Sequence, residues 1–223
     1  MPLKLSASGP VCLLVGILLA TAPASSFAAA PAAGSAQAWA KAKVEDARKL
    51  AMRKVEAGTP AEEAWHTDAK KIIEELLDWD TMTKESLGST WKDLKPDQQK
   101  EFSALLREII EASYQSKLKL ATKGSVKKPK EVKIDWLGAE ENGDKAKVSA
   151  KIKADKTVAQ LDFQLLWNGD HWRVWDIAID DVSTVRTYKT QFRKHIAEKG
   201  FPGLIELMKK KSVDIREGRG DIQ

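Results

Sequence analysis

The segment VKIDWLGAEENGDKAKVSAKIKADKTVAQLDFQLLWNGDHWRVWDIAID, residues 132–180, decides the fold class of this 223-residue chain. Its apolar residues alternate with polar ones, as in Val148, Ala150 and Ile152. A period of two places every second side chain on the same face, which predicts β-strands with one buried face. Tight-turn signals at Asn142-Gly143 and Asn168-Gly169 imply short connections and therefore an antiparallel sheet, which we expect to have four strands.

The turn between the last two predicted strands determines which residues share a face. A two-residue turn would place Asp176 opposite Leu161. A three-residue turn would place Ile177 opposite Leu161 and Trp175 opposite Phe163. We favour the three-residue turn, because burying a carboxylate without partners costs several kcal/mol.

Helical periodicity precedes the strands. Apolar residues recur at steps of three and four from Ala38 to a stop at Gly58. The run Thr59-Pro60-Ala61-Glu62 then supplies an N-cap, a proline at the first helical position and a capping-box glutamate. It predicts a second helix ending near Leu77. Residues 31–36 are expected to form a flexible leader.

Further helices surround the sheet. A short helix is predicted over residues 81–87, and a long one begins at Pro96. After the strands, helical spacing runs from Val182 to Lys199 and is broken at Gly200-Phe201-Pro202-Gly203 before a final short helix. We predict one domain over residues 31–211, followed by a polar, frayed tail over residues 212–223.

The first 30 residues have the pattern of a secretory signal peptide. The apolar run Val11–Ala20 is shorter than the roughly 20 residues that span a bilayer. Small residues follow, and both Ser26-Phe27-Ala28 and Ala28-Ala29-Ala30 fit the cleavage pattern. We therefore expect export and cleavage, with residues 1–30 removed.

The composition argues against most enzyme classes. Cys12, the only cysteine, lies in the predicted signal peptide, so the mature chain has no thiol. His66, His171 and His195 show no metal-ligand spacing, and no phosphate-binding glycine motif or GxSxG motif occurs. The formal net charge is only +5, and the lysines of residues 117–133 have no interleaved aromatic residues. We expect neither catalysis nor a metal, and no nucleic-acid partner.

Apolar and aromatic residues on the strands admit two interpretations. They can fill a core, or they can form the walls of a cavity between sheet and helices. Periodicity alone leaves both open.

Several segments resemble the MlaC, or toluene-tolerance, family of periplasmic phospholipid-binding proteins. They extend in order over about 130 residues from Leu76 onward. The segments are DWDTM (78–82), LGSTW (87–91), PDQQKEF (96–102), Tyr114, WRVWD (172–176), DVS (181–183), YKTQF (188–192) and KGFPGLI (199–205).

The resemblance implies an NTF2-like α+β fold, in which helices wrap a curved four-stranded antiparallel sheet around an apolar pocket for acyl chains. It also implies a monomeric periplasmic carrier with phospholipid as cargo and no cofactor. The implied partners are an outer-membrane lipoprotein–porin complex and an inner-membrane ABC transporter with an MCE-domain subunit. Such Mla-type transport is associated with the lipid asymmetry of the outer membrane.

Family and predicted faces together nominate residues that contact the lipid tails. They are Leu105, Ile109, Val148, Ile152, Leu161, Phe163, Leu165, Trp175, Ile177, Val185, Tyr188 and Phe192.

Two alternatives remain open at this stage. One is an NTF2-like enzyme acting on an apolar small molecule, for which an inward-facing Asp176 would be the indication. The other is a carrier of a hopanoid or another isoprenoid lipid. The chain has Trp175 and Asp181 where the family usually has Tyr and Gly, which leaves lipid selectivity open.

Overall fold

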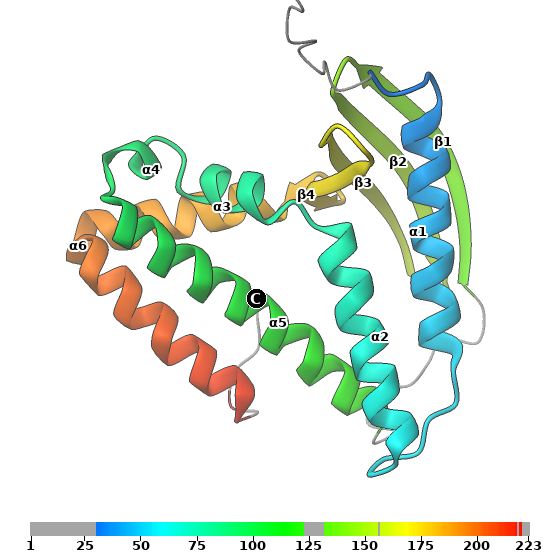
Figure 1. Ribbon diagram of the computed structural model, residues 1–223, viewed down its shortest axis with the longest axis horizontal. Helices are drawn as coiled ribbons and strands as arrows, with labels where there is room; N and C mark the ends of the chain where they lie inside the picture. The colour runs from blue at the N-terminus through cyan, green and yellow to red at the C-terminus, as the bar shows by residue number, and fades with distance from the viewer. Residues whose placement is uncertain (1–29, 123–131, 156, 218, 220–223) are drawn as a thin grey trace, which may run out of the picture.

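The computed structural model describes residues 30–122, 132–155, 157–217 and 219. The predicted signal peptide lies outside these residues except for its last one. Within the described chain, helices precede and follow a single sheet (Figure 1). The elements are α1 (Ser35–Met52), α2 (Pro60–Leu76), α3 (Trp79–Leu87), α4 (Thr90–Asp93), α5 (Pro96–Thr122), β1 (Val132–Asn142), β2 (Lys145–Ala154), β3 (Thr157–Trp167), β4 (Trp172–Ile179), β5 (Val182–Ser183) and α6 (Thr184–Arg216).

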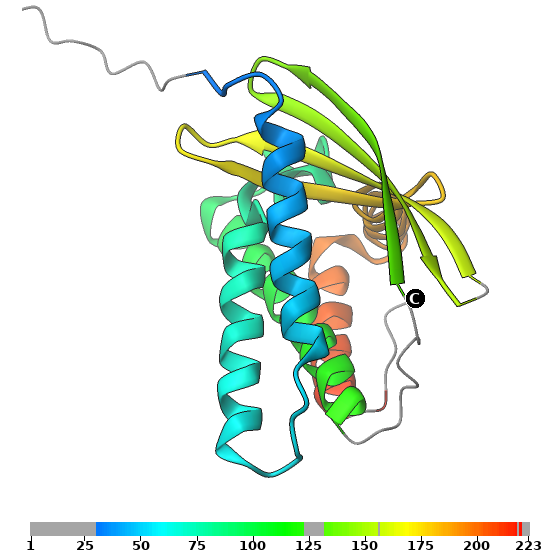
Figure 2. The same cartoon turned by 90° about the vertical axis from the view of Figure 1, so that its right-hand side faces the viewer.

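The sheet has the strand order β1-β2-β3-β4-β5, and every neighbouring pair is antiparallel. Its strands twist strongly across one another (Figure 2). The predicted α+β class with an antiparallel sheet is confirmed, and the four predicted strands correspond to β1–β4. A fifth strand of two residues, Val182–Ser183, was missed because it is too short to show a period of two.

The predicted register between β3 and β4 is wrong. The connection has four residues, so that Trp167 pairs with Trp172, and a bulge at Trp175 then shifts the register. As a result Phe163 pairs with Ile177, and Gln164 pairs with Asp176. The bulge therefore places Val174 and Ile177 on the same face of β4, opposite Leu165 and Phe163. Neither predicted turn length allowed this, because regular alternation would put Val174 and Ile177 on opposite faces.

Helix α1 lies across β1 and β2 (Figures 1 and 2). It begins at Ser35, three residues earlier than predicted, because Glu141 of β1 caps its first turn. The Glu141 carboxylate accepts hydrogen bonds from the backbone N–H groups of Gly34 at 2.8 Å and Ala36 at 2.9 Å. The end of the predicted leader is therefore structured, and Ala36 is fully buried.

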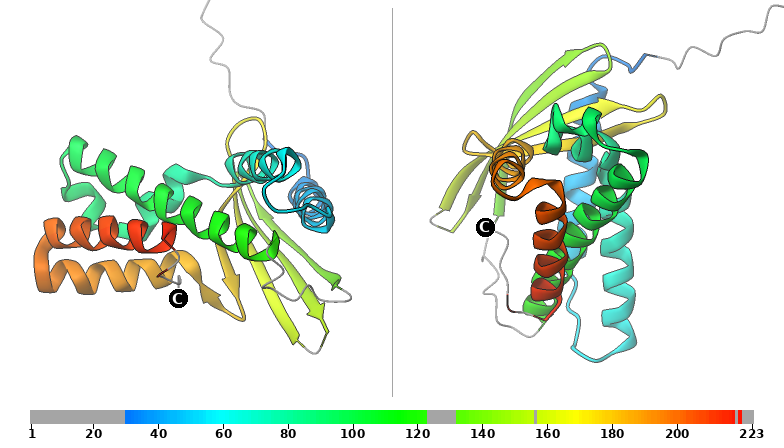
Figure 3. Two further views of the ribbon diagram at one scale, coloured as in Figure 1. Left: turned by 90° about the horizontal axis from the view of Figure 1, so that it is seen from below. Right: turned by 90° about the vertical axis from the view of Figure 1, so that its left-hand side faces the viewer.

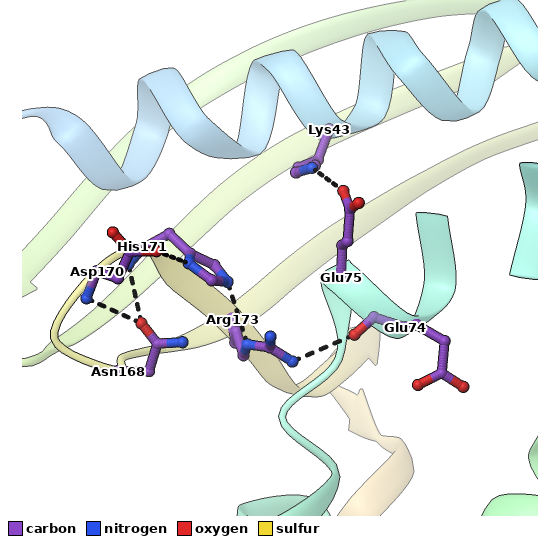
Figure 4. Close-up of polar contacts among 7 residues, drawn as sticks. All are labelled: Lys43, Glu74, Glu75, Asn168, Asp170, His171 and Arg173. Atoms are coloured by element: carbon purple, nitrogen blue, oxygen red, sulfur yellow. Dashed lines mark hydrogen bonds and ion pairs between the residues drawn. The ribbon is translucent and has the colours of Figure 1, made fainter. Parts of the chain in front are cut away.

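Polar contacts fix α2 against the sheet and against α1 (Figure 4). The Arg173 guanidinium of β4 donates to the backbone carbonyls of Glu74 and Leu77, both at 3.2 Å. Carbonyls at a helix C-terminus have no partner within the helix, so Arg173 satisfies groups that would otherwise need water. Lys43 of α1 forms an ion pair with Glu75 of α2 at 3.0 Å.

Helices α3, α5 and α6 form a layer that extends beyond the sheet (Figure 3). Helix α6 is broken at Gly200, where the sequence predicted a break. Its φ of 69° and ψ of 175° are not helical, and glycine adopts such a conformation readily. Its second arm runs beside α5. The arm is joined to α5 by ion pairs from Lys209 to Glu101 at 2.7 Å and from Arg216 to Glu108 at 2.8 Å.

The C-terminal arm of α6 continues past the predicted boundary at residue 211. Ser212 and Ile215 are buried, and the Ser212 hydroxyl donates to Glu108 at 2.8 Å. The expectation of a frayed tail is therefore wrong for residues 212–216. Among the helices that the structure describes, none is long and apolar enough to cross a membrane.

Candidate ligand-binding cavity

An apolar cavity of about 520 Å³ lies between the end of β4, β5, α5 and the first arm of α6. Its mouth carries Ile179 and Val182, which are 50% and 63% exposed. Exposed apolar side chains beside an apolar cavity are a typical feature of ligand sites. The lining residues are Leu77, Met82, Ile110, Ser113, Tyr114, Ile177, Ile179, Val182, Thr184, Thr187 and Tyr188.

A two-residue turn holds the apolar pair at the mouth. Asp180 and Asp181 both have positive φ, 47° and 65°, which is the pattern of a type I′ hairpin turn joining Ile179 to its partner Val182. The Asp180 carboxylate accepts from the backbone N–H of Gln160 at 2.8 Å and anchors the turn to β3. Aspartate tolerates this left-handed conformation better than most residues with a side chain, so it suits both turn positions.

The hydroxyl groups of the cavity are mostly used within the protein. Ser113, Thr184 and Thr187 each donate to a backbone carbonyl at 2.8 or 2.9 Å. Burial raises the pKa of Tyr188, and burial together with a neighbouring glutamate raises the pKa of Tyr114. Both phenols are therefore neutral at physiological pH, so the wall is uncharged and suits an apolar ligand.

Two of the twelve residues predicted to contact lipid tails, Ile177 and Tyr188, line this cavity. The other ten lie elsewhere, and their contact with lipid stays a prediction. Three of them are buried between sheet and helices, with Leu161 packed against them: Val148, Phe163 and Leu165. Three more lie in the core between α5 and α6: Leu105, Ile109 and Phe192. A polar hollow is bordered by Trp175 and Val185, and Ile152 is half-buried on β2.

Most of the wall was not predicted, because seven of the twelve predicted residues lie on the strands and four of the five on the helices lie off the cavity. Ile110 and Tyr114 are one helical turn apart on the apolar stripe of α5, and this spacing was the signal available. Leu77 lies between α2 and α3, and Met82 lies in the first turn of α3. Neither a junction residue nor a single turn of a short helix shows a periodicity that points to a cavity, so only the folded chain brings these two residues to it.

A polar hollow of about 770 Å³ lies on the opposite face of the sheet and includes Asp176. Asp176 is buried, and its two oxygens accept from the Ser183 hydroxyl at 2.6 Å and the Val185 backbone N–H at 2.9 Å. Both oxygens thus hold the N-terminus of α6. An inward-facing Asp176 was the feature that would indicate an enzyme, but Asp176 does not line the apolar cavity. No group of acidic, His or Cys side chains within the described ranges could hold a metal ion.

Known proteins share this architecture. The chain is similar in structure to a phospholipid-binding protein from Ralstonia solanacearum, solved in complex with a phospholipid, with a TM-score of 0.64. The two are 21% identical, and the match covers 81% of this chain and 98% of the other, so the likeness shows a shared fold. No curated protein matches the chain. The family model described as MlaC protein matches residues 45–210, which is well over half of the sequence. The chain therefore belongs to the MlaC family.

Proposed function

We propose that this protein binds phospholipid and carries it through the periplasm. The observation that carries the proposal is the apolar cavity, open at Ile179 and Val182, in a chain of the MlaC family. Its volume of about 520 Å³ falls within the roughly 300–1,000 Å³ typical of ligand pockets. The phospholipid held by the Ralstonia solanacearum protein of the same fold supports this choice of ligand.

A carrier of this kind needs no chemistry of its own. Exposing two acyl chains of about 16 methylenes each to water costs on the order of 25 kcal/mol, at roughly 0.8 kcal/mol per methylene. A protein cavity that receives the chains lowers this barrier. Because cavity and bilayer are both apolar, the net free energy of transfer is close to zero. Small differences at the docked membranes then set the direction.

The finer part of the proposal concerns location and partners. The predicted signal peptide would export the chain, after which it shuttles lipid between the outer and inner membranes. The partners that the family suggests are an outer-membrane lipoprotein–porin complex and an inner-membrane MCE-domain ABC transporter. The transporter would supply the energy, since the sequence has no nucleotide-binding motif.

The binding proposal is tested by identifying what the protein carries. The mature chain is purified from a bacterial periplasm, and native mass spectrometry measures the mass of any bound molecule before and after organic extraction. We expect a stoichiometric diacyl phospholipid. A stoichiometric hopanoid or isoprenoid would show a carrier of another lipid, and an empty protein would contradict the proposal.

Transport is tested separately. Lipid-loaded protein is incubated with nanodiscs that contain the inner-membrane MCE-domain transporter, and with empty nanodiscs as the control. We expect labelled lipid to leave the protein faster with the transporter present. Equal transfer to both would refute this partner while leaving lipid binding intact.

A further inference from the structure

The apolar cavity has room for one acyl chain. A methylene group is close in size to a water molecule, which occupies about 30 Å³, so a cavity of about 520 Å³ holds about 17 methylenes. A single chain of about 16 methylenes fills this volume, whereas the two chains of a diacyl phospholipid need about twice as much. The second chain of such a lipid therefore has to lie outside the cavity.

The face of the sheet that packs against α1 is covered at one end and open at the other. Along β2, Val148 and Ala150 are 0% and 1% exposed, whereas Ile152 is half-buried. Along β3, Phe163 is buried, whereas Leu161 is half-buried. Figure 2 shows that the sheet extends beyond α1 where β2 ends and β3 begins. The helices therefore leave this end of the face accessible to water.

The open end of this face is continuous with the mouth of the cavity. Ile134 of β1 pairs with Ile152 of β2, and Leu161 of β3 pairs with Ile179 of β4. Leu161 also pairs with Ala150, which lies two residues before Ile152 on β2. Paired residues of an antiparallel sheet project from the same face, so all of these side chains share it. We call Ile134, Ile152 and Leu161 the open apolar strip, which begins where Ile179 ends the cavity.

The open apolar strip is left uncovered by the packing of the described chain. Of the three apolar clusters that the described residues form, none includes Ile134 or Ile152. The smaller residues between them and Leu161 on this face are Ala150 and Ala159, so no charged side chain of the described strands interrupts the strip. From β4 to β1 the face spans three strand spacings of about 4.8 Å, or about 14 Å. An acyl chain that leaves the mouth can lie across it.

Resting on the proposed function, we infer that the protein holds the two chains of a phospholipid at different sites, one in the apolar cavity and the other along the open apolar strip. The chains diverge at the mouth, where Ile179 lies between cavity and strip. A lipid with one chain needs only the cavity. Lysophospholipids, which carry a single acyl chain, are therefore a second class of cargo, and they bind without using the strip.

The test compares a lipid with one chain and a lipid with two chains of the same kind. Delipidated mature protein is titrated at pH 7.4 with oleoyl lysophosphatidylglycerol or with vesicles of dioleoyl phosphatidylglycerol, and native mass spectrometry measures the bound fraction of each. The wild type should bind both. Ile152→Glu should weaken binding of the diacyl lipid at least about tenfold and up to about 1,000-fold, because a glutamate of pKa about 4.3 must lose its hydration or take up a proton under the second chain. It should leave binding of the lysolipid unchanged.

Val158→Glu is the matched control. Val158 is β-branched like Ile152 and lies on the neighbouring strand, but it projects from the opposite face, because the adjacent residue Ala159 is the one that pairs with Ile152. Val158 is 56% exposed, so Val158→Glu should bind both lipids as the wild type does. Ile134→Glu places the same charge in the strip from β1 and serves as a second variant if Ile152→Glu does not fold, which circular dichroism checks. It should show the same selective loss of the diacyl lipid.

The outcomes separate the two proposals. Equal losses of both lipids in the strip variants would overturn the inference, because both chains would then share one site. Undiminished binding of the diacyl lipid by folded strip variants would overturn it as well, since the strip would hold no chain. A wild type that binds the diacyl lipid and rejects the lysolipid would exclude the second class of cargo and leave the carrier function standing. A wild type that binds neither lipid would overturn the carrier function itself.

Discussion

A negative charge on the wall of the apolar cavity should expel lipid without unfolding the protein. Thr187 is the best position, because it lines the cavity, is half-buried and lies near the start of α6, where glutamate is compatible with the helix. In the empty protein the new carboxylate of Thr187→Glu is reached by water. When acyl chains fill the cavity, the carboxylate must either lose its hydration or bind a proton.

The loss of lipid-binding free energy cannot exceed the cost of protonating the new carboxylate, because a neutral side chain can be buried against the acyl chains. Neutralising a glutamate of pKa about 4.3 at pH 7.4 costs about 4 kcal/mol, at 1.36 kcal/mol for each pH unit. Lipid binding should therefore weaken by up to about 1,000-fold at pH 7.4. At pH 5 the same cost is about 1 kcal/mol, so the defect should shrink to about fivefold.

The control is Thr190→Glu on the same helix. Thr187 and Thr190 make equivalent hydrogen bonds, to the carbonyls of Ser183 at 2.8 Å and Arg186 at 3.0 Å, but Thr190 is exposed and lies off the cavity. Native mass spectrometry gives the lipid-bound fraction at both pH values, and circular dichroism checks folding. A folded Thr187→Glu protein that keeps its lipid at pH 7.4 as well as Thr190→Glu does would refute the assignment of the cavity.

Three further predictions concern the scaffold. Asp176→Ala should lower the free energy of unfolding in urea by about 2–3 kcal/mol, because the Ser183 hydroxyl and the start of α6 lose their acceptor; a change below 0.5 kcal/mol would contradict this role. Burial raises the pKa of Tyr188 above 10.0, so the unfolded chain releases this proton first and stability falls as pH rises through 10 and above. Between pH 9 and 11 the melting temperature should fall less for Tyr188→Phe than for the wild type, and an equal fall in both proteins would contradict this role of Tyr188. Gly88→Ala should destabilise by about 1–2 kcal/mol, since φ is 58° and the added Cβ would lie 2.4 Å from the Lys189 Cε; an unchanged urea midpoint would exclude this strain.

Local patterns predicted the secondary structure well where the interaction that causes it is local. The alternation through residues 132–180 predicted four strands. The Thr59 cap was also predicted, and its side chain accepts from the backbone N–H of Glu62 at 3.3 Å. The start of α1 could not be predicted in this way, because its cap is Glu141, more than 100 residues away.

The cavity was harder to predict than the fold. The residues of β4 were assigned to the predicted wall on the assumption of a regular register, but the bulge at Trp175 depends on tertiary packing, including the hydrogen bonds that make a buried Asp176 tolerable. Val148 and Phe163 on the strands are buried between sheet and helices and do not line the apolar cavity, and their contact with lipid stays a prediction. The apolar cavity lies at the end of β4, where α5 and α6 meet β5.

The most direct test of the account is a crystal structure of the protein loaded with a phospholipid of defined chains. We expect acyl-chain density between α5 and α6, in contact with Ile110, Ile177 and Tyr188, and a mouth at Ile179 and Val182. Chains found in the polar hollow on the other face of the sheet, or a loaded protein whose apolar cavity holds only water, would contradict it.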